Sequence, residues 1–189
     1  MDSRTRLLEA TTALLADRGY HGTGMKDILG ASNVVAGSLY HHFPGGKDEL
    51  AAACVARASH EVAARMEANL RARPPVEAVR AFYAASAAEL VASDYRRGCP
   101  VGTPAAETRT LAEPVAAAVA GAFVDWEGAI TRGLLAHGWA EGEARATASV
   151  LLSLYEGALL VARAERSTAP LEAAARYSCD IVSRPTPGA

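Results

Sequence analysis

Apolar residues recur every three or four positions along most of this chain. The clearest run consists of Leu111, Val115, Val119, Phe123, Trp126, Ile130 and Leu134. Because an α-helix has about 3.6 residues per turn, this spacing puts the whole run on one helix face. Alternating runs of Val, Ile and Thr, which would indicate strands, are not seen, and alanine is abundant. The sequence therefore predicts an all-α fold in which helix packs on helix.

Caps and helix breakers divide the chain into about nine helices, three short ones followed by about six more. The first begins near Ser3, its expected cap, and stops at Gly19, and the second begins at Thr23, also expected as a cap. The remaining predicted ranges are 35–42, 47–72, 76–93, a turn within the irregular 94–107, then 111–138, 142–165 and 170–183. Residues 183–189 are expected to form a frayed tail.

Composition narrows the class of protein. The 189 residues suffice for one or two small domains, and a net charge of −2 gives no electrostatic sign of nucleic-acid or membrane binding. Cys54, Cys99 and Cys179 lie far apart, which favours reduced thiols in a cytoplasmic protein. The N-terminus lacks the apolar stretch of a signal peptide. The most apolar segment, 148–162, is short for a membrane span and contains Glu156, so we expect no membrane association.

Enzyme and metal chemistry have little support in the sequence. The motifs GxSxG and HExxH and the phosphate-binding P-loop are missing. His41 and His42 are adjacent, and neighbouring side chains on a helix diverge, so they could not share one ion. Glu-x-x-His pairs, which a di-metal helical bundle needs, are also missing. We expect no catalytic activity, no metal and no cofactor.

The second and third helices with their connecting turn form a helix-turn-helix arrangement, in which the second helix of the pair can enter the major groove of DNA. Asn33 suits the left-handed position that the turn requires. Val34, Leu39 and Phe43 form an apolar side that would hold the third helix to the first two. Its other side carries Ala36, Gly37, Ser38 and His41, mostly small residues that would let the backbone approach base edges.

The segment from Thr23 to Leu50 resembles a known family. The pattern TxxxxIxxxxxVxxGSLYxHFxxKxxL is the signature of the TetR/AcrR transcriptional regulators, and the match covers about residues 5–52. The extra glycine in FPGGK and the segment GCPVGTPAAE at 98–107 are similar to the subgroup related to LmrA and YxaF. The resemblance implies a DNA-binding domain over 1–46 and a ligand-binding and dimerisation domain over 47–189.

The resemblance also implies the DNA contacts. The residues that the resemblance implies as DNA contacts are Thr23, Lys26, Val35, Ala36, Gly37, Ser38, Tyr40, His41 and Lys47. Phosphates would be bound by Thr23, by the Tyr40 hydroxyl and by Lys47 at the start of a helix, where the helix dipole also favours an anion. His42 is expected to be structural and half-buried. The family often has Ser or Thr and then Lys where this chain has Val35 and Ala36. Residues 1–50 carry five Lys and Arg against six Asp and Glu, so non-specific DNA affinity should be modest.

The remaining implications concern ligand and partner. Candidate ligand-binding residues are Phe82, Tyr83, Cys99, Val101, Phe123, Trp126 and Tyr155, and for each aromatic residue a core position and a pocket position stay open. The implied protein is a one-component regulator, favoured as a repressor, that binds palindromic operator DNA as a homodimer through about 142–165 and 170–183. A small apolar or aromatic ligand would release it. The alternatives are a helical adaptor or structural bundle without DNA binding, and a ligand-dependent activator.

Overall fold

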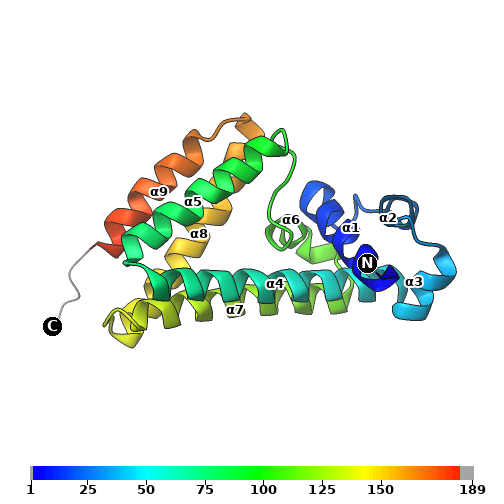
Figure 1. Ribbon diagram of the computed structural model, residues 1–189, viewed down its shortest axis with the longest axis horizontal. Helices are drawn as coiled ribbons and strands as arrows, with labels where there is room; N and C mark the ends of the chain where they lie inside the picture. Colours follow the sequence, from blue (N-terminus) through cyan, green and yellow to red (C-terminus); the bar gives the residue numbers. More distant parts are fainter. Residues whose placement is uncertain (1, 184–189) are drawn as a thin grey trace. The chain divides into compact units, whose positions relative to one another are not determined.

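The computed structural model describes residues 2–183, which form nine α-helices and one short 3-10 helix (Figure 1). They are α1 (Ser3–Arg18), α2 (Met25–Ser32), α3 (Ala36–His42), α4 (Gly46–Ala72), α5 (Pro75–Ala92), α6 (Gly102–Ala105), η1 (Thr108–Thr110), α7 (Glu113–Leu135), α8 (Glu141–Glu165) and α9 (Ala169–Val182). No residue in the described range forms a strand, and the predicted all-α fold is confirmed. The tail expected at 183–189 lies, from residue 184 on, outside the described residues.

The chain divides into two compact units. The first comprises Met1–His60 and Gly98–Phe123, and the second comprises Glu61–Arg97 and Val124–Ala189. Both α4 and α7 therefore contribute residues to each unit. The functional boundary predicted between residues 46 and 47 falls inside the first unit, so the helix-turn-helix shares a compact unit with the first half of α4 and with the 98–123 segment.

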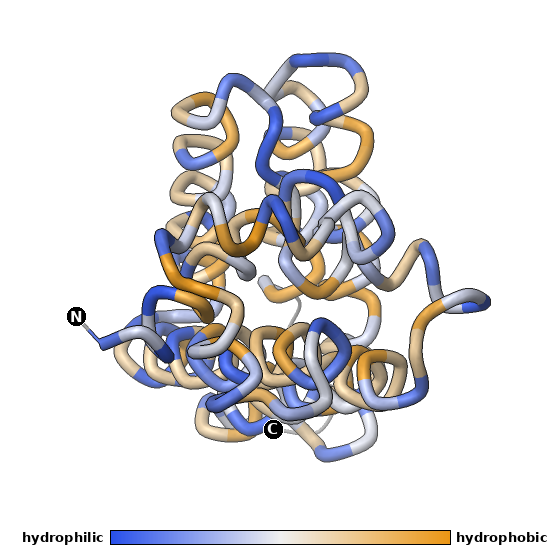
Figure 2. Tube along the Cα trace, turned by 90° about the vertical axis from the view of Figure 1, so that its right-hand side faces the viewer, coloured by the Kyte–Doolittle hydropathy of each residue, from blue (hydrophilic) through white to orange (hydrophobic). Residues whose placement is uncertain are grey.

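The core of the first unit lies where α1, α2 and α3 meet. Leu7 and Leu15 of α1, Ile28 of α2 and Leu39 of α3 are all completely buried. Burying one such side chain contributes about 1.5–3 kcal/mol relative to leaving it exposed. Figure 2 shows hydrophobic and hydrophilic residues interleaved along the helices, as expected when each helix buries one face.

The caps of the first two helices each lie one residue away from the predicted caps. Asp2, not Ser3, caps α1: its carboxylate accepts the N–H of Thr5 at 2.7 Å, and this bond lowers the pKa of Asp2. At α2 the cap is Gly24, whose N–H is bound by the carboxylate of Asp27 at 3.2 Å. The predictions of Ser3 and Thr23 as caps are therefore wrong.

The predicted helix ends in this unit are confirmed. Gly19 has φ +74°, and its N–H donates to the carbonyl of Leu15 at 3.0 Å, which closes α1. Asn33 has φ 51° and ψ 46°, the left-handed conformation expected of the turn residue. Pro44 and Gly45 separate α3 from α4, and Gly46 starts α4 with φ +68°.

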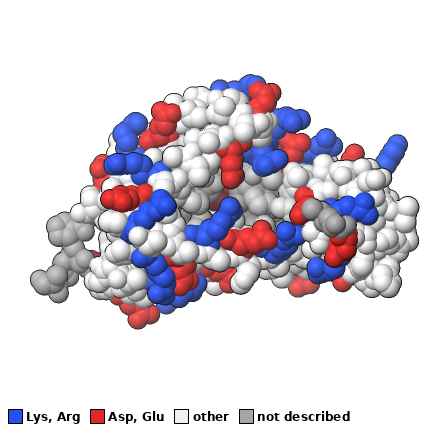
Figure 3. All heavy atoms as spheres, viewed as in Figure 1, with Lys and Arg blue, Asp and Glu red and all other residues white. Residues whose placement is uncertain are grey.

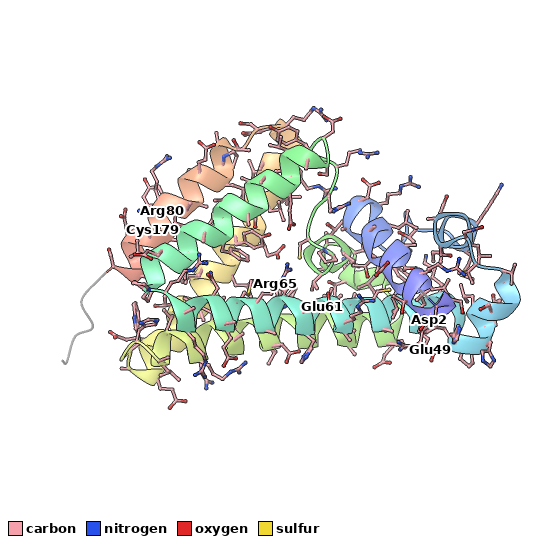
Figure 4. The ribbon with its side chains drawn as sticks, in the orientation of Figure 1. Asp2, Glu49, Glu61, Arg65, Arg80 and Cys179 are labelled. Carbon is pink, nitrogen blue, oxygen red and sulfur yellow. The ribbon has the colours of Figure 1, made fainter. Side chains whose placement is uncertain are left out.

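In the second unit, α9 packs along α5 and α8 (Figure 1). The Tyr83 hydroxyl of α5 and the Ser178 hydroxyl of α9 lie 3.1 Å apart in a buried hydrogen bond, and burial raises the pKa of Tyr83. At one end of this helix pair the Cys179 thiol lies 3.7 Å from the Val76 carbonyl. Figure 4 shows Cys179 beside Arg80, the residue one turn along α5 from Val76. Val76 lies at the start of α5 and Cys179 lies near the end of α9, so the two helices run antiparallel.

A strained bend follows α5 in this unit. Asp94 and Tyr95 have φ of 54° and 60°, a left-handed conformation that residues other than glycine rarely adopt. Arg166, at the end of α8, donates to the Asp94 carboxylate at 2.6 Å and to the Asp94 carbonyl at 3.2 Å. Arg163 donates to the carbonyl of Arg96 at 2.7 Å. The end of α8 thus holds the chain in the bend.

Helix α8 presents much of its apolar surface to the outside. An 18-residue stretch within Glu141–Glu165 has a mean hydropathy of 1.3, but only 28% of it is buried. By length and composition alone this helix could cross a membrane. The prediction that segment 148–162 is too short for a membrane span therefore does not apply to the whole helix. Val150, Leu160 and Val161 are 47%, 64% and 43% exposed. Their spacing places them on one side of α8, which forms an uncovered apolar stripe.

Candidate DNA-binding face and effector cavity

Helix α3 is held to the first unit by one face and exposes the other. Leu39 and Phe43 are 0% and 2% exposed, whereas Val35 and Tyr40 are 75% and 53% exposed. Ala36, Gly37 and His41 are also exposed, and Ser38 is half-buried. The predicted division of this helix into a packing side and an outer side is confirmed. The outer side carries mostly small residues, so its backbone can be approached closely.

Contacts from α1 fix the C-terminal end of α3. The Ser3 hydroxyl and the His42 Nε2 atom lie 2.7 Å apart, and the Arg4 guanidinium lies 5.5 Å from the centroid of the Phe43 ring. His42 is half-buried, as predicted. The adjacent His41 is exposed on the outer side of the helix. These contacts orient the short helix, which has no side-chain cap of its own.

Tyr40 lies next to the start of α4. A Cβ atom added at Gly46 would meet the Tyr40 Cε1 atom at 3.4 Å, so the ring packs against this glycine. More than half of the Tyr40 side chain stays exposed. Its position fits the prediction of a packed ring with a hydroxyl free to reach a phosphate, and that contact stays a prediction.

Lys47, in the first turn of α4, is held against the ring of Tyr20. Its Nζ atom lies 4.0 Å from the ring centroid, close enough for a cation–π interaction. Partial burial lowers the pKa of Lys47, while the nearby carboxylates of Asp48 and Glu107 act in the opposite direction. The ammonium group is therefore fixed in place rather than extended into solvent.

The N-terminal end of α4 already has a negatively charged partner. The Glu49 carboxylate accepts the N–H of Gly45, the residue before the helix, at 2.7 Å. Asp48 in the same turn accepts a hydrogen bond from the Tyr20 hydroxyl. The positive end of the helix dipole is thus partly neutralised by the chain itself, which weakens the predicted contribution of the dipole to phosphate binding.

The two candidates before α3 differ in accessibility. Thr23 is completely buried, and its hydroxyl donates to the carbonyl of Gly19 at 2.7 Å. A buried hydroxyl that already donates within the chain does not favour a contact of the Thr23 side chain with a phosphate, and the predicted phosphate contact of Thr23 stays a prediction. Lys26, on the first turn of α2, is exposed and available to a phosphate.

Charge on the face seen in Figure 3 is mixed, with Lys and Arg interspersed among Asp and Glu. The end where Figure 1 places α3 is largely uncharged in this view. Such a surface favours short-range contacts with base edges over long-range attraction to the DNA backbone. Within residues 2–183, no group of three or more His, Cys, Asp and Glu side chains is arranged to bind a metal ion.

The second unit contains an apolar cavity of about 60 Å³. Its lining comes from α4, α5, α7 and α8 and consists of Met66, Asn69, Leu70, Ala78, Val79, Phe82, Tyr83, Ile130, Leu151, Leu152 and Tyr155. The rings of Phe82 and Tyr155 meet edge to face with centroids 4.7 Å apart. The Ser86 hydroxyl donates to the Tyr155 hydroxyl at 3.2 Å, so the aromatic wall has a polar anchor.

Three of the seven predicted ligand residues, Phe82, Tyr83 and Tyr155, line this cavity. The other four do not. Cys99, Val101 and Phe123 belong to the first unit, where Cys99 and Val101 are buried. Trp126 belongs to the second unit and is 1% exposed. A ligand contact of these four stays a prediction.

Sequence reasoning missed residues at both sites. Tyr20 and Glu107 were not predicted, although Tyr20 lies against Lys47 and Glu107 acts on Lys47 electrostatically. In the cavity, Met66 and Leu152 were missed because an aliphatic side chain at helical spacing looks the same whether it lines a cavity or fills a core. The sequence placed Glu107 in the segment 98–107 but carried no signal for its contact with Tyr20.

Two protein families match the chain. Residues 7–54 match "Bacterial regulatory proteins, tetR family", and residues 75–177 match "Transcriptional regulator LmrA/YxaF-like, C-terminal domain". Two regulators of Bacillus subtilis, YxaF and LmrA, are 33% and 32% identical to it over 171 residues, which cover 90% of this chain and 90% and 91% of theirs.

A solved structure agrees. Escherichia coli NemR in its reduced form superposes with a TM-score of 0.83 at 26% identity, covering 100% of both chains. The fold of the whole chain, the exposed outer side of α3 and both family matches lead to the same assignment. The chain belongs to the TetR family of bacterial transcriptional regulators, which act by binding DNA and not by catalysis, and its C-terminal domain is of the LmrA/YxaF type.

Proposed function

We propose that this protein is a one-component, cytoplasmic transcriptional repressor that binds a palindromic operator as a homodimer and leaves it when a small apolar or aromatic effector binds. The observation that carries the proposal is the outer side of α3, where Val35 is 75% exposed while Leu39 behind it is completely buried. Repression is favoured over activation because the relative NemR, 29% identical over 97% of this chain, is named a transcriptional repressor.

At the operator, α3 would lie in the major groove. Val35 and Ala36 offer apolar contacts to thymine methyl groups, and Ser38 and His41 offer hydrogen bonds to base edges. Gly37 would let the helix backbone come close to the bases. Lys26, Tyr40 and Lys47 would contact phosphates on either side and set the register of the helix on the duplex.

The apolar stripe of α8 supports the dimer. Val150, Leu160 and Val161 are exposed on α8, and Tyr177 of α9 is 66% exposed. Gly157 has open space beyond its backbone, so a second helix could approach closely there. A two-fold pairing of α8 and α9 would cover this surface, with no membrane required. It would also bring together two DNA-binding domains, here called heads (residues 1–46 of each copy), as a palindromic site needs.

The effector would enter the apolar cavity beside Phe82, Tyr83 and Tyr155. A volume of about 60 Å³ is small, so a ligand of several rings must push α5 and α8 apart. A ligand that binds the widened form better will shift the protein toward that form. If the widened form spaces the two heads wrongly for the operator, DNA and effector weaken each other's binding to the same degree.

The DNA half of the proposal can be tested at Gly37. A Cβ atom added there would meet nothing within 4 Å, so Gly37→Gln should fold normally. In the complex, the added side chain would fill the space meant for base edges. We expect operator binding roughly 10- to 100-fold weaker in a mobility-shift assay. The control is Gly121→Gln, because Gly121 in α7 also has open space. Equal binding by both variants would contradict the assigned groove contact.

The effector half can be tested at Ala78, which is 1% exposed and lines the cavity. A library of planar aromatic compounds would be screened for release of the operator. Ala78→Leu should fill the cavity and abolish the response to each active compound while operator binding persists. A response that survives in this variant would place the effector site elsewhere.

A further inference from the structure

The segment 98–107 has no task in the functions described so far. Its contacts in the first unit lead to the end of α1. The Gly98 N–H donates to the Ala16 carbonyl at 2.9 Å, and the Thr103 hydroxyl donates to the same carbonyl at 3.4 Å. Carbonyls in the last turn of a helix have no partner within the helix. The segment therefore supplies hydrogen bonds that α1 itself lacks.

Glu107 continues these contacts into the turn between α1 and α2. Its Oε2 atom accepts the backbone N–H groups of Tyr20 at 2.7 Å and His21 at 3.2 Å. A Cβ atom added at Gly19 would lie 2.6 Å from the Glu107 Oε1 atom, so the carboxylate fits closely only against glycine. The His21 Nε2 atom and the Thr110 hydroxyl, 2.8 Å apart, make a second link from the same region.

The residue held by Glu107 is also the residue that holds Lys47. The Tyr20 side chain is 6% exposed, and its hydroxyl donates to Asp48 at the start of α4. Its ring lies under the Lys47 ammonium, 4.0 Å from Nζ to the ring centroid. Glu107 therefore fixes the backbone of Tyr20, and the Tyr20 ring fixes the charge of Lys47. The carboxylate of Glu107 is also close enough to act electrostatically on Lys47.

We propose that Glu107 is a positioning residue for DNA binding, which acts through Tyr20 to place the Lys47 ammonium at an operator phosphate. Glu107 itself makes no contact with DNA in this arrangement. The proposal rests on the proposed function, since it requires that Lys47 bind a phosphate. It gives the segment 98–107 a role in operator affinity.

The direction in which operator affinity changes when Glu107 is replaced distinguishes a positioning role from a purely electrostatic one. Removing a carboxylate near the head should strengthen attraction to DNA if charge alone matters. If Glu107 positions Lys47, Glu107→Ala should instead weaken operator binding about tenfold and reduce the slope of log affinity against log salt by about one. Lys47→Ala should change both quantities to the same extent. The double variant should be no weaker than Lys47→Ala alone.

Two further variants complete the test. Glu107→Asp keeps the charge but shortens the reach, so it should lower the salt slope as Glu107→Ala does. It also provides the comparison if Glu107→Ala fails to fold. Glu107→Gln keeps a carbonyl acceptor for the Tyr20 N–H and should restore the wild-type slope. The matched control is Glu113→Ala, which removes an exposed carboxylate at the start of α7.

Operator duplexes selected with the wild-type protein would be titrated with each folded variant over a range of salt. The proposal is overturned if Glu107→Ala or Glu107→Asp keeps the wild-type slope, or if the losses from Glu107→Ala and Lys47→Ala add in the double variant. If the wild-type protein selects no duplex, the proposed function itself fails. If Lys47→Ala keeps the wild-type slope, only the phosphate contact of Lys47 and this proposal fail.

Discussion

At the scale of single residues, α3 separates stability from DNA binding. Leu39 is completely buried and Val35 is 75% exposed, although they are four positions apart in the sequence. Val35 is the extended residue before α3, so it points away from the packed face, and Leu39 within the helix holds the helix in place. Mutations on the two sides should therefore affect different properties, with stability lost on the inner side and DNA binding lost on the outer side.

We expect Leu39→Ala to destabilise the protein by about 2–5 kcal/mol, because it leaves a cavity where α3 packs on α1. Val35→Ala should change stability by less than about 0.5 kcal/mol, because that side chain contacts mainly solvent. Val35→Ala should instead weaken operator binding. Denaturant unfolding and mobility-shift titration of both variants measure the two effects. A Leu39→Ala protein as stable as wild type would contradict the assigned packing.

Tyr20 provides a test by pH. Burial and the hydrogen bond to Asp48 raise its pKa from 10.0 to about 12. The folded chain therefore keeps a proton that the unfolded chain loses near pH 10. This contribution to stability is complete below about pH 10 and disappears as the pH rises toward about 12.

Tyr20→Phe should abolish that part of the alkaline loss of stability. Denaturant midpoints measured between about pH 9 and about pH 11 should fall less steeply for Tyr20→Phe than for wild type. The matched control is Tyr40→Phe, because Tyr40 is 53% exposed and lies outside the proposed dimer surface, and it should change the curve less than Tyr20→Phe does. A Tyr20→Phe curve identical to the wild-type curve would contradict this contribution of Tyr20.

At the scale of secondary-structure elements, most helices could be predicted from the sequence. The long periodic run over 111–134 became α7, and the Pro-Gly-Gly break did separate α3 from α4. Helix starts were harder, since Asp2 and Ser3 are both good caps and the choice depends on which residue is extended. Glu107 could not be assigned at all, because its bond to Tyr20 joins residues 87 positions apart and depends on tertiary packing.

The C-terminal end of α8 stores strain that can be measured. Arg166 has φ 52° and forms two hydrogen bonds to Asp94. Arg166→Ala loses those bonds and keeps the unfavourable backbone conformation, whereas Arg166→Gly loses the bonds but relieves the conformation.

We therefore expect Arg166→Gly to be more stable than Arg166→Ala by about 1 kcal/mol. Arg166→Ala should be less stable than wild type, and Arg166→Gly should lie near wild type, because the exposed ion pair lost in both contributes at most about 1 kcal/mol. Denaturant midpoints give the ranking. An alanine variant equal to or better than the glycine variant would contradict the account of strain at this helix end.

At the scale of the whole molecule, the fold class and the outer side of α3 followed from the sequence, but the cavity did not. Helical periodicity shows which residues face inward, and it does not show where packing leaves a gap. Phe82, Tyr83 and Tyr155 were predicted only as aromatic residues that either fill a core or line a pocket. The uncovered stripe on α8 likewise required the structure, because a sequence cannot show which apolar face lacks a partner.

If the apolar stripe of α8 forms the proposed dimer interface, Leu160→Glu will disrupt the dimer. A carboxylate at the centre of an apolar interface would lose its water without gaining a partner. Light scattering should then show a monomer, and operator binding should fall by about 100-fold or more, because two linked heads bind far more tightly than one. The control is Val124→Glu, since Val124 of α7 is 69% exposed but lies off the stripe. Dimers of equal stability in both variants would place the interface elsewhere.

We propose that the outer side of α3 reads duplex DNA, and selection of bound duplexes from a random pool tests this role. For the wild-type protein without effector, we expect enrichment of a palindrome whose half-sites are about one helical turn, or a multiple of it, apart. Gly37→Gln should enrich no such sequence. A wild-type protein that enriches nothing, or a Gly37→Gln protein that enriches the same palindrome, would contradict the claim.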